Sequence, residues 1–222
     1  MTAKLIFPSV DLSNVKGVLS DLDNTLYNFD DCHAKAVECC YHAGGFKMTL
    51  SDFRDLYIEH RRLIIEKLHE LPACRSRTLV FQNMFESMER KHPFVDALRF
   101  SECYWRKFIS VMKVDDKALA FLKDCKKRKI PVCLVTDMLT EIQIKKIKKL
   151  RIVPYIAYIA SSEEATVEKP DAAIFKLALA KLGLSAKDVI MIGDNLKKDI
   201  KGADALNIKS YLVEMRRERV KG

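Results

Sequence analysis

The stretch GVLSDLDNT (residues 17–25) ends a short apolar run with two carboxylates, Asp21 and Asp23, placed two residues apart. The run has the length and apolar character of a strand buried within a sheet. Two acids so close together repel each other, and the neighbouring Asn24 and Thr25 carry no positive charge. Neutralisation therefore has to come from residues far away in the sequence, which the fold must bring to this point.

Four later segments have the pattern of short strands, and three of them are preceded by amphipathic helical patterns. The strands are expected at residues 130–135, 155–160, 189–192 and 210–213, and the helices at residues 116–129, 140–150 and 171–182. This alternation predicts an α/β fold, a Rossmann-like doubly wound parallel sheet. Right-handed crossovers bring the carboxyl ends of all its strands to one edge, where open α/β sheets bind ligands.

Residues 28–113 interrupt the alternation with helical periodicity alone. We expect an all-helical domain inserted into a catalytic core that consists of residues 1–27 and 114–222. The insertion contains most of the aromatic residues, which we expect to form its own core. We interpret its arginines as solvated helix faces, with contact to the distal end of an anionic substrate as the alternative. They are Arg61, Arg62, Arg75, Arg77 and Arg106.

The helix expected over residues 140–150 has an apolar side and a lysine-rich side. Ile144, Ile147 and Leu150 are expected to face the core, and the lysines of the run KKIKK (residues 145–149) to face solvent.

Polar side chains follow four of the predicted strands. They are Asp21, Asp23, Thr136, Lys169 and Asp194. Each has an ordinary structural interpretation when taken alone, since aspartate caps helices and Gly-Asp is common in turns. Their shared place at one edge of the sheet instead favours a site. Several acids in one cleft indicate a hard divalent cation, and Mg²⁺ prefers oxygen ligands.

The motifs DLDNT, VTD, EKP and GDNLKKD, in this order, resemble those of the haloacid dehalogenase (HAD) superfamily. The helical insertion resembles the helical type of cap in that superfamily, and the resemblance spans about residues 15–213. It implies a magnesium-dependent phosphomonoesterase that acts on a small phosphorylated metabolite, a nucleotide or a sugar phosphate, through an aspartyl-phosphate. It also implies a mobile cap that closes over the substrate and excludes water.

The resemblance assigns a role to each matching residue. Asp21 matches the nucleophile that accepts the phosphoryl group. Asp23 matches the general acid that protonates the leaving oxygen and then becomes the base that activates water. The phosphate oxygens are expected to contact the side chains of Thr136 and Lys169 and the backbone N–H groups of Leu22 and Asp137.

The same resemblance implies the metal ligands. They are Asp21, the backbone carbonyl of Asp23, and Asp194, with Asp199 as an outer-sphere acid. Asp137 departs from the family pattern, which commonly has asparagine there, and an extra carboxylate beside the phosphate would weaken binding. The presence of Asp23, which haloacid dehalogenases proper lack, favours phosphoryl transfer over cleavage of a carbon–halogen bond.

Two other functions remain open. A phosphotransferase or phosphomutase of the same superfamily would pass the phosphoryl group to a sugar instead of water. A non-catalytic binding or regulatory protein would retain the fold without turnover.

The formal net charge of +9 fits an anionic substrate, nucleic acid, an anionic lipid surface or simply a soluble basic surface. Because the chain has no recognised nucleic-acid motif and no apolar run near 18 residues, we expect neither nucleic acid nor a membrane as partner. The seven cysteines include no CxxC pair, which argues against zinc. Together with the lack of an apolar leader segment, this predicts a reduced, cytoplasmic setting. The oligomeric state stays open.

Overall fold

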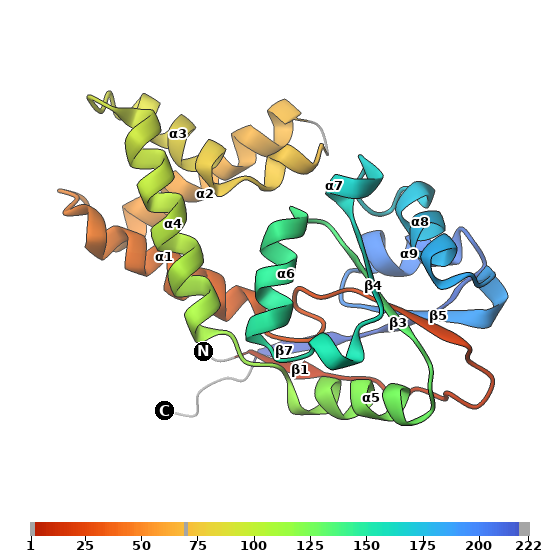
Figure 1. Cartoon of the computed structure of the whole chain (residues 1–222). Helices are drawn as coiled ribbons and strands as arrows, with labels where there is room; N and C mark the ends of the chain where they lie inside the picture. Colours follow the sequence, from red (N-terminus) through yellow and green to blue (C-terminus); the bar gives the residue numbers. More distant parts are fainter. Residues whose placement is uncertain (1–2, 69–70, 218–222) are drawn as a thin grey trace. The chain divides into compact units, whose positions relative to one another are not determined.

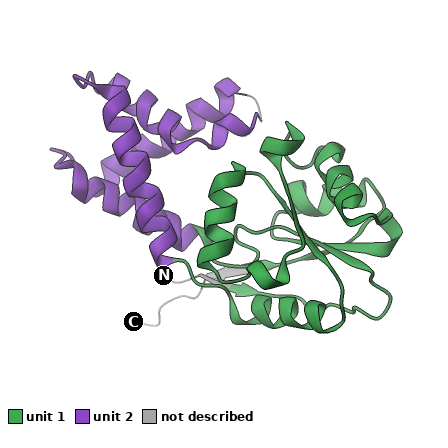
Figure 2. Cartoon of the chain, viewed as in Figure 1, with its two compact units in different colours: residues 1–29, 112–222 green, residues 30–111 purple. Residues whose placement is uncertain are grey.

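A computed structural model describes residues 3–68 and 71–217 of the chain. It divides into two compact units, which Figure 2 colours separately. Unit 1 comprises residues 1–29 and 112–222, and unit 2 comprises residues 30–111. Residues 1–2 and 218–222, which the sequence analysis assigns to the core, lie outside the described residues. The assignment of the insertion as a closing cap stays a prediction.

Unit 1 contains the predicted parallel sheet, with the strand order β4-β3-β2-β5-β6. The strands are β2 (Gly17–Ser20), β3 (Val132–Thr136), β4 (Tyr158–Ser161), β5 (Val189–Gly193) and β6 (Lys209–Leu212). The helices between them are α5 (Asp116–Lys127), α6 (Thr140–Lys149), α7 (Ser162–Ala165), α8 (Ala172–Leu182) and α9 (Lys201–Asp204). The α/β fold class expected from the alternating pattern is therefore confirmed.

Both faces of the sheet are covered, so its central strands are buried along their whole length and are mostly apolar. Every residue of β2, β3 and β5 is buried. Leu19 and Cys133 pack with Phe175 of α8 on one face, while α5 lies on the other side of the sheet (Figure 1). A strand buried on both faces cannot alternate apolar and polar residues, which is why these segments read as continuous apolar runs.

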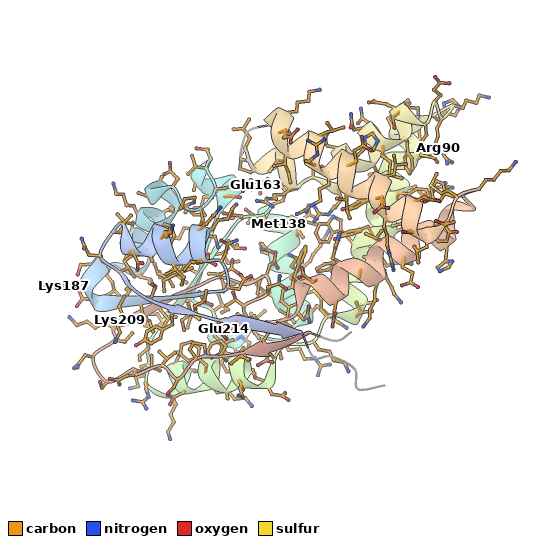
Figure 3. The ribbon with its side chains drawn as sticks, turned by 180° about the vertical axis from the view of Figure 1, so that it is seen from behind. Arg90, Met138, Glu163, Lys187, Lys209 and Glu214 are labelled. Atoms are coloured by element: carbon orange, nitrogen blue, oxygen red, sulfur yellow. The ribbon has the colours of Figure 1, made fainter. Side chains whose placement is uncertain are left out.

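The register places the ends of the central strands side by side. Ser20 of β2 pairs with Leu134 of β3 and with Ile192 of β5. Met138 lies just after the carboxyl end of β3, and Lys187 lies just before the amino end of β5. Figure 3 shows these two residues well apart, as expected for opposite ends of a parallel sheet. The residues that directly follow β2, β3 and β5 therefore meet at one edge of the sheet.

A small second sheet was not expected from the sequence. Strands β1 (Ala3–Ile6) and β7 (Glu214–Arg217) pair antiparallel, although they lie near opposite ends of the chain (Figure 1). Each strand has four residues, which is too short for a periodic pattern to stand out from its surroundings.

Helix α6 differs from the two-sided pattern expected for it. Ile144 is 45% exposed, whereas Lys146 is fully buried, so the prediction was wrong for both residues. The buried face instead contains Gln143, Lys146, Ile147 and Leu150, which are spaced as one side of a helix. Lys146 tolerates burial because it contacts a carboxylate of the same unit.

Unit 2 is all-helical over the residues that the structure describes, as expected. Its helices are α1 (Phe29–Gly44, which begins one residue before the unit), α2 (Leu50–Leu68), the 3₁₀ helix η1 (Pro72–Arg75), α3 (Arg77–Ser87) and α4 (Pro93–Val111). Phe53, Phe81, Phe85 and Phe100 are buried in an aromatic core that joins these helices. In the described part of the chain, no helix has both the length and the apolar composition needed to span a bilayer.

Candidate active site

Three of the predicted acids converge at the carboxyl edge of the sheet. Asp21 follows β2, Asp194 follows β5, and Asp199 lies in the short helix η4 (Leu196–Ile200). One carboxylate oxygen from each lies within 4.8 Å of the others. The convergence follows from the register, because β2 and β5 are neighbouring parallel strands. It provides a set of oxygen ligands of the kind that a hard cation prefers.

Lys169 supplies the positive charge that the DLDNT stretch lacks. Its ammonium donates to Oδ1 of Asp21 and to Oδ1 of Asp199, each at 2.7 Å. It also donates to the backbone carbonyl of Val135 at 2.9 Å, and its side chain is almost fully buried. Burial disfavours the charged form, yet Asp199 and Asp21 outweigh this effect and raise the pKa of Lys169 well above its usual value.

One lysine does not balance three acids. Burial, together with the charges of Asp199 and Asp194, raises the pKa of Asp21 well above its ordinary value, even though Lys169 opposes the shift. Burial and then Asp199 raise the pKa of Asp194 to about 6. The cluster thus holds more negative charge than its surroundings neutralise, which a divalent cation would relieve.

Thr25 connects two members of the cluster. Its hydroxyl donates to Oδ2 of Asp21 at 3.0 Å and lies 3.4 Å from Oδ1 of Asp194. This threonine lies within the motif DLDNT, and no role was expected for it from the sequence. Its position four residues after Asp21, at the turn that follows a strand, was the available signal.

The carboxylate of Asp23 forms a separate ion pair. Both of its oxygens accept from the ammonium of Lys146 at 2.8 Å, and Oδ1 also accepts from the hydroxyl of Tyr27. The ammonium lies over the rings of Tyr27 and Phe29. Lys146 was not expected at this site, because a lysine within a lysine-rich helical run has the pattern of a solvated face.

Thr136 and Asp137, two further residues of the predicted phosphate site, lie beside Lys169. Thr136 is buried at the end of β3, directly after the carbonyl that Lys169 contacts, and its hydroxyl accepts from the Gln143 amide. Oδ1 of Asp137 accepts from the backbone N–H of Lys169 at 2.9 Å. The expected contacts of the Leu22 and Asp137 N–H groups with phosphate stay predictions.

The departure at Asp137 has a structural explanation. The ammonium of Lys198 donates to Oδ2 of Asp137 at 2.8 Å and to the buried Glu168 at 2.7 Å. Lys198 belongs to the GDNLKKD motif, so it links the loops that follow β3, β4 and β5. Lys198 therefore balances part of the negative charge of Asp137, which lessens the repulsion that a phosphate would meet.

Comparison with known proteins gives a consistent result. A family model described as haloacid dehalogenase-like hydrolase matches residues 15–207. The ribulose-1,5-bisphosphate 5-phosphatase of Halopiger xanaduensis is 30% identical, over 89% of this chain and 84% of that protein. The glyceraldehyde 3-phosphate phosphatase of Methanocaldococcus jannaschii is 26% identical, over 87% and 82%. The crystal structure of a HAD phosphatase from Thermococcus onnurineus has a similar fold, with a TM-score of 0.67 at 17% identity over 94% and 90%.

Proposed function

The chain belongs to the haloacid dehalogenase-like hydrolases, and from this premise we propose that it is a magnesium-dependent phosphomonoesterase of small phosphorylated metabolites. One observation carries the proposal. The ammonium of the buried Lys169 contacts both Asp21 and Asp199, next to Asp194. A carboxylate nucleophile needs a positive charge beside it to approach a phosphate, and Lys169 supplies one.

In the first step, Asp21 is the nucleophile. A carboxylate oxygen of Asp21 attacks phosphorus, and the bond between phosphorus and the leaving oxygen breaks. Asp23, once it is protonated and no longer in its ion pair with Lys146, gives its proton to that leaving oxygen, so an alcohol departs and an aspartyl-phosphate remains. Lys169 stabilises the negative charge on the phosphate oxygens, and the Thr136 hydroxyl helps to orient them.

In the second step, the phosphoryl group passes to water. Asp23, now ionised, takes a proton from a water molecule as its oxygen attacks phosphorus. The bond between phosphorus and the Asp21 oxygen breaks, so inorganic phosphate is released and the carboxylate of Asp21 is restored. Because Asp23 ends as an acid, the next cycle begins in the same protonation state.

The carboxylate cluster fits a magnesium ion. Asp21 and Asp194 would hold it together with the backbone carbonyl of Asp23. Asp199 would stay outside the coordination sphere, as the resemblance implies, and its oxygens accept from Lys169 and from the backbone N–H of Asn195. When bound, Mg²⁺ supplies positive charge against the carboxylates and the phosphate oxygens.

The two relatives described above support a sugar phosphate as substrate. Their names specify a phosphorylated pentose and a phosphorylated triose, and both match more than four fifths of this chain. A nucleoside monophosphate belongs to the same range of small phosphate monoesters and stays within the proposal.

A metabolite panel tests the proposed function. Release of inorganic phosphate from sugar phosphates and nucleotides is expected with Mg²⁺, and EDTA is expected to abolish it until excess Mg²⁺ is restored. Calorimetry with Mg²⁺ alone provides a measurement that does not depend on turnover. A protein that binds Mg²⁺ but releases no phosphate from any ester would instead be a binding protein. Transfer of phosphate to another sugar, without release, would identify a phosphotransferase or mutase.

Asp23→Asn is expected to slow hydrolysis according to the leaving group. Esters of simple alcohols should lose about 10²–10⁴-fold in kcat, because the alkoxide needs a proton as it departs. A nitrophenyl ester should lose much less in its first step, since nitrophenolate leaves without protonation. The measurement is single-turnover kinetics on both types of ester.

The exposed Asp116, on α5, provides a control for this variant. Asp116→Asn should leave both rates unchanged. If Asp23→Asn slowed the first step equally for the alkyl and the nitrophenyl esters, Asp23 would not be the general acid.

A further inference from the structure

The ion pair between Lys146 and Asp23 contacts a reacting residue, and the steps described above give it no positive role. The side chain of Lys146 is fully buried, and both carboxylate oxygens of Asp23 lie 2.8 Å from its ammonium. An ammonium on a flexible stem fixes a carboxylate only where the ammonium itself is held in place. The surroundings of Lys146 therefore decide what this pair can do.

The stem of Lys146 is held by the helix that carries it. Gln143, Lys146 and Ile147 lie on the buried side of α6, and residues three apart on a helix are neighbours. The Gln143 amide donates to the hydroxyl of Thr136, at the end of β3. One turn of α6 thus contacts two side chains of the site, Thr136 and Asp23, and these contacts hold the helix against the edge of the sheet.

Two aromatic rings lie beside the ammonium. Nζ of Lys146 is 5.9 Å from the ring centroid of Tyr27 and 5.3 Å from that of Phe29, distances at which the face of a ring attracts a cation. Tyr27 is completely buried, and its hydroxyl also donates to Oδ1 of Asp23. The carboxylate is therefore held from two directions, by α6 and by the loop that follows β2.

These contacts leave an acceptor position of the carboxylate available. An ionised carboxylate has about four lone-pair positions, shared between its two oxygens. Oδ1 of Asp23 accepts from both Lys146 and Tyr27, whereas in the described part of the chain Oδ2 accepts from Lys146 alone. The Asp23 side chain is 22% exposed, so the pair does not seal it off. Oδ2 is therefore the oxygen that can accept a proton from water.

We propose that Lys146 is a positioning residue for the second step of the reaction. The inference rests on the proposed function, which makes Asp23 the base of that step. In the first step Asp23 is protonated and outside the ion pair. Once its proton has passed to the leaving oxygen, the carboxylate is negative again and returns to the ammonium of Lys146.

The restored pair places Oδ2 of Asp23 for the attack of water. The water oxygen bonds to phosphorus, its proton passes to Oδ2, and the bond between phosphorus and the Asp21 oxygen breaks. Inorganic phosphate leaves, and the Asp21 carboxylate is restored. Protonation of Oδ2 removes the charge that holds Asp23 to Lys146, so the residue is ready for the next first step.

Lys146→Met tests the step at which the pair acts. Methionine retains the apolar stem and removes the ammonium. With a nitrophenyl ester, the aspartyl-phosphate should form within about threefold of the wild-type rate, whereas its hydrolysis should slow at least about tenfold. Nitrophenolate should then appear as a burst followed by slow turnover, and acid-quenched protein should show the mass of the phosphorylated chain. A merely structural role would not slow one step selectively.

A double variant shows whether Lys146 acts through Asp23. Asp23→Asn alone should slow the second step, because an amide cannot take the proton. When Lys146→Met is added to Asp23→Asn, the second step should slow by no more than about twofold further. Two losses that multiply would show that Lys146 acts independently of Asp23, and would overturn the proposal.

Lys145 provides the matched control. It precedes Lys146 on α6, its side chain is 53% exposed, and it pairs with Glu141, so Lys145→Met removes the same charge away from the site. Both steps should stay unchanged in this variant. If Lys146→Met fails to fold, as checked by circular dichroism, Lys146→Gln removes the charge but keeps a polar side chain. The same selective loss in the second step is expected for it.

Formation of the intermediate separates failure of this inference from failure of the proposed function. A wild-type protein that forms no aspartyl-phosphate with any ester refutes the proposed function, and this inference with it. If the wild type forms and hydrolyses the intermediate, but the Lys146 variant hydrolyses it at the wild-type rate, only this inference is overturned. Equal slowing of both steps, or the same loss in Lys145→Met, also overturns it alone.

Discussion

Asp21→Asn is expected to lower kcat by at least about 10⁴-fold, which corresponds to roughly 5.4 kcal/mol of lost transition-state stabilisation. An amide cannot attack phosphorus to form the acyl phosphate on which the proposed mechanism depends. The measurement is release of inorganic phosphate under single-turnover conditions, with the best ester from the metabolite panel. Mass spectrometry of the variant should exclude conversion of the asparagine back to aspartate.

The same substitution should leave the fold intact. Burial and the neighbouring acids Asp199 and Asp194 raise the pKa of Asp21, so its ionised form opposes folding in the metal-free protein. Asparagine has nearly the same shape without the charge. The free energy of unfolding in EDTA is therefore expected to stay constant or to rise, as measured by urea denaturation. Near-normal turnover in a verified variant would end the proposed mechanism.

Lys169→Met should have the largest combined effect on activity and stability. Methionine preserves the length and apolar character of the stem but leaves Asp21 and Asp199 without their shared cation. Removal of one partner from a buried ion pair typically costs about 3–5 kcal/mol, and we expect the free energy of unfolding at pH 7 to fall by this amount. The kcat should fall at least about 10²–10³-fold, since phosphate charge is no longer stabilised.

The stability loss should depend on pH. Lys169 opposes the raised pKa values of Asp21 and Asp194, so without it both pKa values rise further above those of the unfolded chain. The folded variant then binds more protons than the unfolded chain, so its stability decreases as pH rises. In the protein itself, the pKa of Asp194 is already raised to about 6. Urea denaturation in EDTA should therefore show a smaller difference between variant and wild type at pH 5 than at pH 7.

The exposed Lys176 of α8 provides the control for charge removal. Lys176→Met should change the free energy of unfolding by no more than about 0.5 kcal/mol at either pH. If Lys169→Met were as stable as the wild type at pH 7, the contacts of Lys169 with the two carboxylates would contribute nothing to the free energy of unfolding.

The parallel sheet, and the carboxyl edge at which its acidic residues lie, could be predicted from local sequence patterns. Apolar runs such as residues 130–135 have the character of strands buried on both faces, and helical patterns between them require parallel connections. Parallel strands then bring their carboxyl ends to one edge, so Asp21 and Asp194 meet whatever the details of the loops. The roles of these residues came from the resemblance of four ordered motifs.

Other features depend on partners that are distant in the chain. Nothing in the run KKIKK (residues 145–149) distinguishes Lys146 from its neighbours, because its burial depends on Asp23, which lies 123 positions away. Arg77, which is only 2% exposed, is likewise covered by the rings of Tyr104 and Trp105, which belong to another helix, α4. Its interpretation as part of a solvated helix face was therefore wrong. The two short strands β1 and β7 have no periodicity of their own and exist only as a pair.

The order and apolar pattern of the residues alone determined an α/β sheet, a helical insertion and an acidic edge at which Asp21 lies. The tertiary structure alone decided which cations accompany those acids: Lys169 beside Asp21, Lys146 beside Asp23, and Lys198 beside Asp137. The physical reason is that apolar periodicity is encoded within a few consecutive residues. The pairing of a buried charge depends instead on distance in space, which only the complete fold establishes.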